Sequence, residues 1–278
     1  MKDTHKESAP ILEREITEGK TKIIYEHPLD ASRVVVRSKD DITAGDGARR
    51  ETIEGKAVLA TETTSNVFTL LNKKGIPTSF IKRINATDFE ALHCKMIPLE
   101  VVMRRQALGS YLKRNPNTQK GETFKRPLGE LYLKTKDKKW NGKAIPKDDP
   151  LSLVENGSFV LFRPDQPLIK QKPFLSVPRS EVLPAKVSLL EIGIIAEKVF
   201  ATLEEAWRTL GVELADMKIE FGITKEGKVV VSDVIDNDSW RLLQNGKHLD
   251  KQVFRDGTGG QEVKNLYELV AKLTSRFV

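Results

Sequence analysis

The stretch "KIEFGITKEGKVVVSDVID", Lys218–Asp236, has the pattern of two short strands joined by a tight turn. Side chains along a strand alternate between its two faces, so the apolar residues Ile219 and Phe221 face away from Glu220. With a two-residue turn at 226–227, Glu220 would lie opposite Asp233. Directly opposed residues have Cβ atoms roughly 5 Å apart. The sequence therefore predicts an antiparallel hairpin with one apolar face and a pair of carboxylates on the other.

Two carboxylates at this distance repel each other, and burial strengthens the repulsion. A divalent cation between them would remove the conflict, and oxygen ligands together with phosphate oxygens suit Mg²⁺. Glu220 and Asp233 are therefore candidate Mg²⁺ ligands. Two alternatives stay open: the acids are exposed, or Lys218 and Arg241 form ion pairs with them.

Two further segments carry groups that suit an anionic ligand. In "DNDSWRL", Asp238 and Arg241 lie three residues apart just beyond the second strand, where a binding loop is favoured. A guanidinium there can form a fork with phosphate or carboxylate. In "RRQALGSYLKR", Arg104 and Ser110 fall close together and predict a phosphate or carboxylate pocket. The alternatives are a surface ion pair and a solvated basic face.

Glycine-containing turns near the start of the chain could cover phosphates. "EGKTK" lacks the glycine that a P-loop needs five residues before Gly19, and a strand pattern follows it instead of a helix. Gly19 with Lys20 and Lys22 could still close over phosphates as kinase glycine-rich loops do, although an ordinary hairpin turn has the same pattern. Asp46 in "TAGDGAR" marks either a substrate loop or a turn.

The order of elements predicts an α+β fold with an antiparallel sheet in each half, because strands and helices do not alternate strictly. Apolar spacing predicts helices over about 51–71, 185–210 and 261 to the end, and a buried strand over 97–103. Prolines make 163–184 an irregular surface stretch. We expect a flexible tail at 1–10, a β-rich N-terminal domain at 11–98 and a larger α+β domain at 99–278.

The composition limits the classes of function. Of 278 residues, 46 are basic and 39 acidic, and the net charge of +7 suits an anionic partner. The basic residues are spread out, which favours small anionic ligands over nucleic acid. No apolar run approaches the ~20 residues that span a bilayer, and the first residues do not resemble a secretory signal. A single cysteine, Cys94, excludes an intramolecular disulfide and fits the cytoplasm.

Taken together, six segments in order resemble the SAICAR synthetase (phosphoribosylaminoimidazole-succinocarboxamide synthase) family over about residues 19–255. They are "EGKTKIIYE", "SKDDITAGDGAR", "KMIPLEVVMRRQALGSYLKRNP", "DMKIEFG", "VSDVIDNDSWRL" and "LDKQVFR". Within the family, "VIDNDSWRL" and "LKRNP" look closer to the synthetase part of animal bifunctional enzymes. Two departures are a missing tryptophan after "RL" in "WRLLQ" and the proline-rich stretch, to which we assign no role.

The resemblance implies a reaction: ATP activates the carboxylate of carboxyaminoimidazole ribonucleotide (CAIR), and the amine of L-aspartate attacks it to form SAICAR in purine biosynthesis. It also implies a two-domain fold related to protein kinases and ATP-grasp enzymes, with ATP in the cleft. The partners would be these small molecules, with no nucleic acid and no membrane, and a homo-oligomer stays open.

The resemblance also implies roles for particular residues. ATP would be bound by Gly19, Lys20, Lys22, Met96, Glu100 and Lys134, and Mg²⁺ by Glu220 and Asp233. The ribonucleotide would be bound by Arg104, Ser110, Lys218, Asp238 and Arg241, and Asp46 would lie over the reacting carboxylate or the aspartate. Lys22, Asp233 and Arg241 would act in catalysis by positioning groups and neutralising charge.

Two alternatives remain at this point. The first is another ATP-dependent ligase or kinase-like phosphotransferase with a different acceptor in the pocket of Arg104, Ser110 and Arg241. The second is an RNA- or ligand-binding protein that has lost catalysis, which the presence of Lys22, Glu220 and Asp233 disfavours.

Overall fold

The computed structural model describes residues 14–44, 49–135, 139–145 and 149–277. The predicted flexible tail at 1–10 and the candidate residue Asp46 lie outside these ranges. In the described part the strands form two large antiparallel sheets, and a single parallel bridge joins Thr78 to Val231. The predicted α+β class with antiparallel sheets is confirmed.

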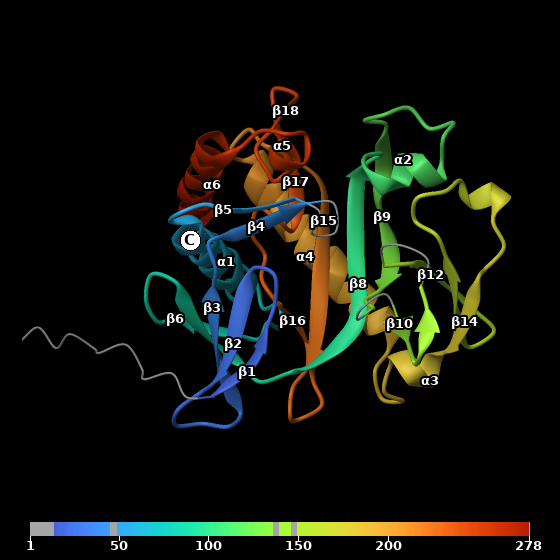
Figure 1. Ribbon diagram of the computed structural model, residues 1–278, viewed down its shortest axis with the longest axis horizontal. Helices are drawn as coiled ribbons and strands as arrows, with labels where there is room; N and C mark the ends of the chain where they lie inside the picture. The colour runs from blue at the N-terminus through green and yellow to red at the C-terminus, as the bar shows by residue number, and fades with distance from the viewer. Residues whose placement is uncertain (1–13, 45–48, 136–138, 146–148, 278) are drawn as a thin grey trace, which may run out of the picture.

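The first sheet has five strands and lies at the lower left in Figure 1. Its order is β1 (Glu15–Glu18), β2 (Lys22–Glu26), β3 (Arg33–Ser38), β7 (Asp88–Leu92) and β6 (Phe80–Arg83). The valines of β3 are buried: Val34 and Val36 belong to the main hydrophobic core, Val35 faces the other side of the sheet, and β3 contacts α1. The turn between β1 and β2 is closed by a hydrogen bond from the Gly19 amide to the Lys22 carbonyl oxygen, 2.8 Å long. This turn brings Lys20 and Lys22 to the side of the sheet that faces the cleft.

The predicted helix from about residue 51 begins later, because the chain first pairs as a strand. β4 (Asp41–Ala44) and β5 (Arg49–Thr52) form a hairpin, and α1 (Lys56–Lys73) follows it. The Asp40 carboxylate accepts hydrogen bonds from the amides of Gly55 and Ala57, which satisfies donors at the start of the helix. Gly75, with φ of 71°, then ends the helix in the left-handed conformation typical of a glycine at this position.

The second sheet has nine strands and begins at β8, two residues after the first sheet ends. Its order is β14 (Leu175–Pro178), β13 (Ser158–Phe162), β12 (Leu151–Glu155), β9 (Thr123–Leu133), β8 (Lys95–Gln106), β15 (Glu213–Ile223), β17 (Trp240–Gln244) and β18 (Lys247–His248), with β16 (Val229–Ser232) paired to β15. A small separate hairpin joins β10 (Lys139–Trp140) and β11 (Lys143–Ala144). The predicted buried strand at 97–103 is the centre of β8.

The predicted register of the opening hairpin is wrong by one residue. Glu220 pairs with Ser232 instead of Asp233, because the hairpin closes at Thr224 and Lys228 around a turn of three residues, 225–227, and not around the two residues predicted. Hydrogen bonds between Thr224 and Lys228 and between Gly227 and Thr224 close this loop, and Gly227 has φ of 83°. Asp233 lies one residue beyond β16, and its backbone is left-handed, with φ of 68°. Both carboxylates nevertheless line one cavity.

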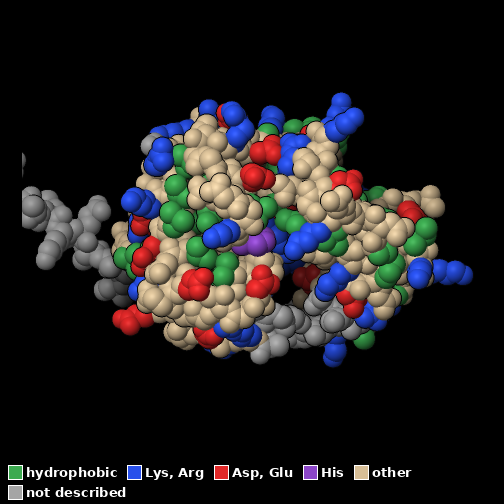
Figure 2. All heavy atoms as spheres, turned by 90° about the horizontal axis from the view of Figure 1, so that it is seen from above, with side chains coloured by type: hydrophobic (Ala, Val, Ile, Leu, Met, Phe, Trp, Pro, Cys, Tyr) green, Lys and Arg blue, Asp and Glu red, His purple; other side chains and the backbone are tan. Residues whose placement is uncertain are grey.

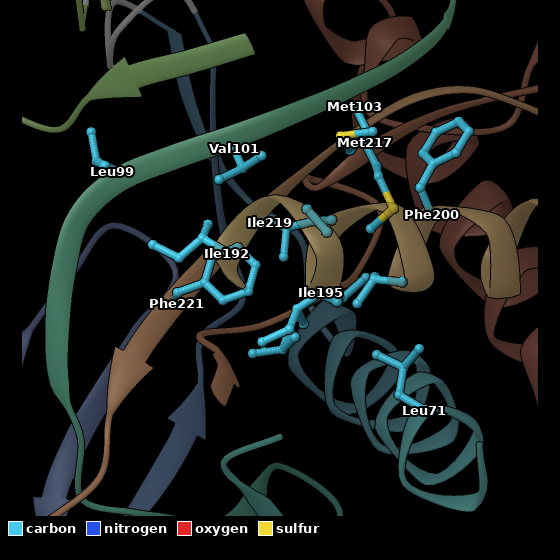
Figure 3. Packing of buried hydrophobic residues seen from close by; sticks show 14 of the residues in the cluster. Leu71, Leu99, Val101, Met103, Ile192, Ile195, Phe200, Met217, Ile219 and Phe221 are labelled. Atoms are coloured by element: carbon cyan, nitrogen blue, oxygen red, sulfur yellow. The ribbon is translucent and has the colours of Figure 1, made fainter. Parts of the chain in front are cut away.

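Three long helices and the sheets enclose the main hydrophobic core. α4 (Leu189–Arg208) lies against β15 and β8, and α6 (Gly260–Thr274) packs against α1 (Figure 1). Figure 3 shows Ile219 and Phe221 directed from β15 toward Ile192 and Ile195 of α4. The predicted alternation along β15 is therefore confirmed, and its polar residues are left to face the cleft. None of the helices among the described residues is long and apolar enough to cross a membrane.

The proline-rich stretch is more ordered than predicted. It contains η1 (Leu168–Lys170), β14 and α3 (Arg179–Val182), and Val177, Val182 and Leu183 are buried. β14 can carry Pro178 because it is the outer strand of its sheet and ends at this residue. The prediction of an irregular surface stretch at 163–184 is thus wrong in part.

Candidate functional site

Three adjoining cavities form one cleft between the two sheets. An apolar cavity of about 400 Å³ shares Lys22 and Asp233 with a middle cavity of about 680 Å³. The middle cavity shares residues with a third cavity of about 270 Å³, among them Glu100, Lys218 and Asp238. Figure 2 shows a hollow near the middle of the molecule, bordered by basic and acidic side chains. The arrangement can hold an elongated ligand next to a second, anionic one.

The first cavity is walled mainly by apolar side chains. They come from the first sheet and the start of β8 and include Ile24, Val36, Phe89, Met96 and Ile97. Four charged residues stand at its border: Lys22, Lys134, Glu220 and Asp233. A flat apolar group fits such walls, while its charged substituents would lie at the border with the middle cavity.

Glu220 is held by two lysines. Its carboxylate accepts a hydrogen bond from Lys134 Nζ and another, 3.0 Å long, from Lys218 Nζ. Burial alone would raise the pKa of Glu220, but Lys218, Lys134 and Lys22 outweigh burial and lower the pKa to about 2. Lys218 also contacts Glu100 at 3.4 Å; burial opposes its charge, yet Glu100 and Glu220 raise its pKa. Glu220 is therefore ionised throughout the physiological pH range.

Asp233 forms an ion pair with Lys22 at the border of the same cavity. Among the described residues, no group of three or more His, Cys, Asp and Glu side chains is arranged to hold a metal ion. Two carboxylates that share a cavity and are neutralised by ammonium groups still fit a hard cation, which would replace the lysine charge with its own. The donor chemistry thus suits Mg²⁺ with phosphate oxygens as the remaining ligands.

The third cavity is built on a row of three residues across neighbouring strands. Asp216 of β15 pairs with Arg104 of β8 on one side and with Arg241 of β17 on the other. Its carboxylate accepts hydrogen bonds from Arg104 at 2.6 Å and from Arg241 at 2.7 and 3.0 Å. Arg241 lies within β17 and not, as predicted, in a loop beyond the strand. Because Arg104, Asp216 and Arg241 all lie on interior strands of the sheet, both guanidinium groups are held in fixed positions.

A buried ion pair orients Arg104 further. Glu130 accepts a hydrogen bond of 2.6 Å from Arg104 Nε and another from the fully buried Arg114. The remaining nitrogen of Arg104, Nη2, is 3.4 Å from Ser110 Oγ at the start of α2 (Ser110–Arg114). Arg104, Arg114 and Arg241 carry three positive charges, and the carboxylates of Asp216 and Glu130 carry two negative charges. The cluster therefore has a net charge of +1. This surplus suits an anionic ligand beside Ser110.

Asp238 lines the middle and third cavities but is also tied to the interior. Its carboxylate accepts hydrogen bonds from Lys251 Nζ at 2.6 Å and from the hydroxyl of the buried Tyr267. Burial would raise the pKa of Asp238, but Lys251 and the buried Lys56 outweigh it and lower the pKa to about 2. Asp238 is thus a fixed anion at the junction of α1, α6 and the cleft.

The structure brings the predicted site residues together, with two exceptions. Asp46 is outside the described residues, and Gly19 shapes the turn between β1 and β2 without lining any of the three cavities. The sequence interpretation missed Asp216, Lys251 and Asp149. Asp216 could have been found, because it precedes Lys218 and Glu220 at the two-residue spacing of one strand face. Asp149 and Lys251 carry no periodic signal.

The fold and site define an enzyme that can hold a nucleotide and an anionic second substrate in one cleft. The chain belongs to the SAICAR synthetase family, whose family model matches residues 15–154 and 179–272. It is 43% identical over 270 residues to the phosphoribosylaminoimidazole-succinocarboxamide synthase of Chloroflexus aurantiacus, covering 94% of this chain and 96% of the relative. It is 40% identical over 247 residues to the "probable multifunctional protein ADE2" of Caenorhabditis elegans, covering 87% of this chain and 52% of that protein.

A solved structure of a SAICAR synthetase in complex with ADP has the same fold. Its TM-score is 0.74 at 28% identity, with 94% of this chain and 97% of that chain covered. The interval between the two matched ranges, 155–178, contains β13, η1 and β14 and overlaps the proline-rich stretch. The proline-rich stretch, which departs from the family pattern in the sequence, thus lies partly in the interval that the family model does not match.

Proposed function

We propose that the chain is an ATP-dependent carbon–nitrogen ligase that joins L-aspartate to the carboxylate of CAIR, giving SAICAR, ADP and phosphate in de novo purine biosynthesis. Membership of the family and the synthase relatives support this function. The observation that carries it is the continuity of the three cavities, apolar at one end, rich in lysine in the middle and built on two arginines at the other.

ATP occupies the first two cavities in this proposal. The adenine ring lies between the apolar side chains near Met96, and Lys134 stands at the border of that cavity. The phosphates extend into the middle cavity, where Lys20 and Lys22 follow the turn at Gly19 and Glu100 lies on the opposite wall. The neighbouring structure with ADP supports nucleotide binding.

The ribonucleotide occupies the third cavity. Arg104, Arg241 and Ser110 offer a cationic, hydrogen-bonding surface for its phosphate or carboxylate. Lys218 and Asp238 line both this cavity and the middle one, so they lie where the acceptor carboxylate meets the terminal phosphate. Asp46 retains its proposed position over the reacting groups from the resemblance alone.

Glu220 and Asp233 are the residues that would hold Mg²⁺. When bound, the ion would neutralise phosphate charge that develops during phosphoryl transfer. Lys22 and Lys218 act beside it: each pairs with a carboxylate and can turn its ammonium group toward phosphate. No side-chain nucleophile is needed, since ATP activates the acid, and the work of these residues is to position and to neutralise charge.

We further propose an ATP-covering domain at 11–98 and a substrate domain at 99–278. We also propose a cytoplasmic location, and partners limited to small molecules without nucleic acid or membrane.

The proposal is tested by product formation. Purified protein is incubated with ATP, Mg²⁺, L-aspartate and CAIR, and both SAICAR and ADP are measured, with L-glutamate in place of aspartate as the control. We expect equal amounts of SAICAR and ADP with aspartate and neither product with glutamate. ADP release with a different carboxylate or amine, and none with this pair, would show instead an ATP-dependent ligase with another acceptor.

A further inference from the structure

Asp149 stands at the point where the middle and third cavities meet. It lines both, together with Glu100, Lys218 and Asp238. In the proposed function, this is where the activated carboxylate of the ribonucleotide must meet the amine of aspartate. The amine has to lose protons during the attack, so a proton acceptor is needed there.

The carboxylate of Asp149 is oriented by one of its two oxygens. Oδ1 accepts a hydrogen bond of 2.8 Å from the amide of Thr135 and one of 2.9 Å from the Thr135 hydroxyl. Among the described residues, Thr135 alone is hydrogen-bonded to this carboxylate. Two donors on one oxygen fix the plane of the group and leave Oδ2 for a ligand.

The other acids of the cleft are held by cations. Asp216 is bound by two arginines and Asp233 by Lys22. Glu220 lies between two lysines, and Glu100 is 3.4 Å from Lys218. Asp238 is held by Lys251 and Tyr267. A carboxylate that is stabilised in its ionised form by a cation is a weak base. This comparison leaves Asp149 as the acid in the cleft best suited to take a proton.

We propose that Asp149 is the general base of amide formation, accepting a proton from the α-ammonium group of aspartate through Oδ2. The ammonium group gives one proton to the Asp149 carboxylate and one to the departing phosphate, and its nitrogen forms the bond to the acyl carbon as the carbon–oxygen bond to phosphate breaks. The acyl phosphate, the ammonium and the carboxylate thus become amide, hydrogen phosphate and carboxylic acid, with charge conserved. This assignment rests on the proposed function.

The surroundings of Asp149 favour this role. Burial raises the pKa of its carboxyl, Glu100 acts in the same direction, and the Thr135 hydrogen bonds and Lys134 oppose them. Lys218, Asp238 and Arg255 also face the same cavities. A raised pKa brings a carboxylate closer to the basicity that proton transfer near neutral pH requires. As the pH falls through this pKa, Asp149 becomes protonated and can no longer act as a base. The rate of the aspartate reaction should therefore fall at acidic pH, and this fall should depend on Asp149.

The test is Asp149→Asn, which keeps the Oδ1 acceptor for Thr135 but cannot take a proton. Hydroxylamine serves as a second nucleophile, because its nitrogen is largely unprotonated at neutral pH and needs less help from a base. We expect aspartate-dependent kcat to fall on the order of 100-fold or more, while hydroxamate formation with hydroxylamine changes by no more than a few-fold. Asp149→Glu, which restores a carboxylate, should recover part of the aspartate reaction.

Asp30→Asn is the matched control, since Asp30 pairs with Arg33 in a surface turn and lines none of the three cavities. Equal losses with aspartate and hydroxylamine would place Asp149 in substrate binding or activation and overturn the proposal, as would full activity of Asp149→Asn. If Asp149→Asn does not fold, Asp149→Glu decides: an unchanged aspartate reaction would contradict a positioned base. Failure of the wild-type protein to form SAICAR would instead refute the proposed function.

Discussion

Gly109 provides a sharp test of the arginine cavity, because its missing side chain makes room for Arg241. A Cβ atom at residue 109 would lie 2.5 Å from Nη2 and 2.9 Å from Cζ of Arg241. Gly109 also has φ of 58° and ψ of −130°, which L side chains rarely adopt. The substitution Gly109→Ala should therefore strain the backbone and push the guanidinium group away from its position beside Asp216.

The two effects have different magnitudes and different readouts. Backbone strain of this kind costs about 1–3 kcal/mol of folding free energy. For a chain of this size that lowers Tm by roughly 2–4 °C per kcal/mol. Loss of a charge-assisted hydrogen bond between Arg241 and the ribonucleotide costs about 1.5–3 kcal/mol. Since 1.4 kcal/mol is a factor of ten, kcat/KM for the ribonucleotide should fall roughly 10- to 100-fold.

Gly121→Ala is the matched control, because Gly121 has φ of 82° and no atom within 4 Å of the Cβ position. Both variants should lose thermal stability, measured by calorimetric unfolding. Only Gly109→Ala should lose ribonucleotide use in steady-state kinetics, with the KM for ATP unchanged in both. Equal ribonucleotide kinetics in the two variants would refute the assignment of Arg241 to this substrate.

Three further predictions concern the rest of the cleft. Arg241→Lys keeps the charge but loses the planar fork, so kcat/KM for the ribonucleotide should fall about tenfold while calorimetric ATP affinity holds; a collapse of ATP affinity alone would move Arg241 to the nucleotide site. Asp233→Asn should weaken the binding of Mn²⁺ in the presence of ADP, followed by electron paramagnetic resonance, on the order of tenfold or more, whereas Asp30→Asn should not. Unchanged Mn²⁺ affinity would contradict the metal assignment. Burial raises the pKa of Cys94 to about 11, so its alkylation by iodoacetamide should rise about tenfold per pH unit between pH 7 and 9 as the thiolate fraction grows. ATP should slow this alkylation because Cys94 lines the apolar cavity, and a rate indifferent to ATP would contradict an adenine site there.

The spacing of apolar residues along the chain predicted a helix or strand correctly where this spacing alone determined the structure. Period-two alternation identified β15, and apolar spacing identified α1 and α4, because these patterns depend only on neighbours along the chain. The same rules extended α1 backward into β5, since pairing with β4 overrides helix spacing at residues 49–52. They also treated β14 as irregular, because its strand forms only by adding to the edge of a sheet.

The sequence also predicted most of the residues of the site, but it missed Asp149 and gave the wrong partner for Glu220. Most of its charged residues were found from the strand pattern and the resemblance to the family, and they do line one cleft. Asp149 was missed because it lies in a segment without periodicity, and its chemistry depends on Thr135, fourteen residues earlier. The pairing of Glu220 with Asp233 was wrong because a turn of three residues, 225–227, replaces the predicted turn of two and shifts the register by one.

The sequence by itself determined which residues of β15 face the core and which face the cleft, because the alternation of side chains is a property of any extended chain. Only the tertiary structure decided the partners: that Asp216 lies between Arg104 and Arg241, and that lysines neutralise Glu220. The contact between Arg104 and Asp216 joins residues 112 positions apart, and that between Lys134 and Glu220 joins residues 86 positions apart. These contacts depend on strand order, register and burial, which no local pattern specifies.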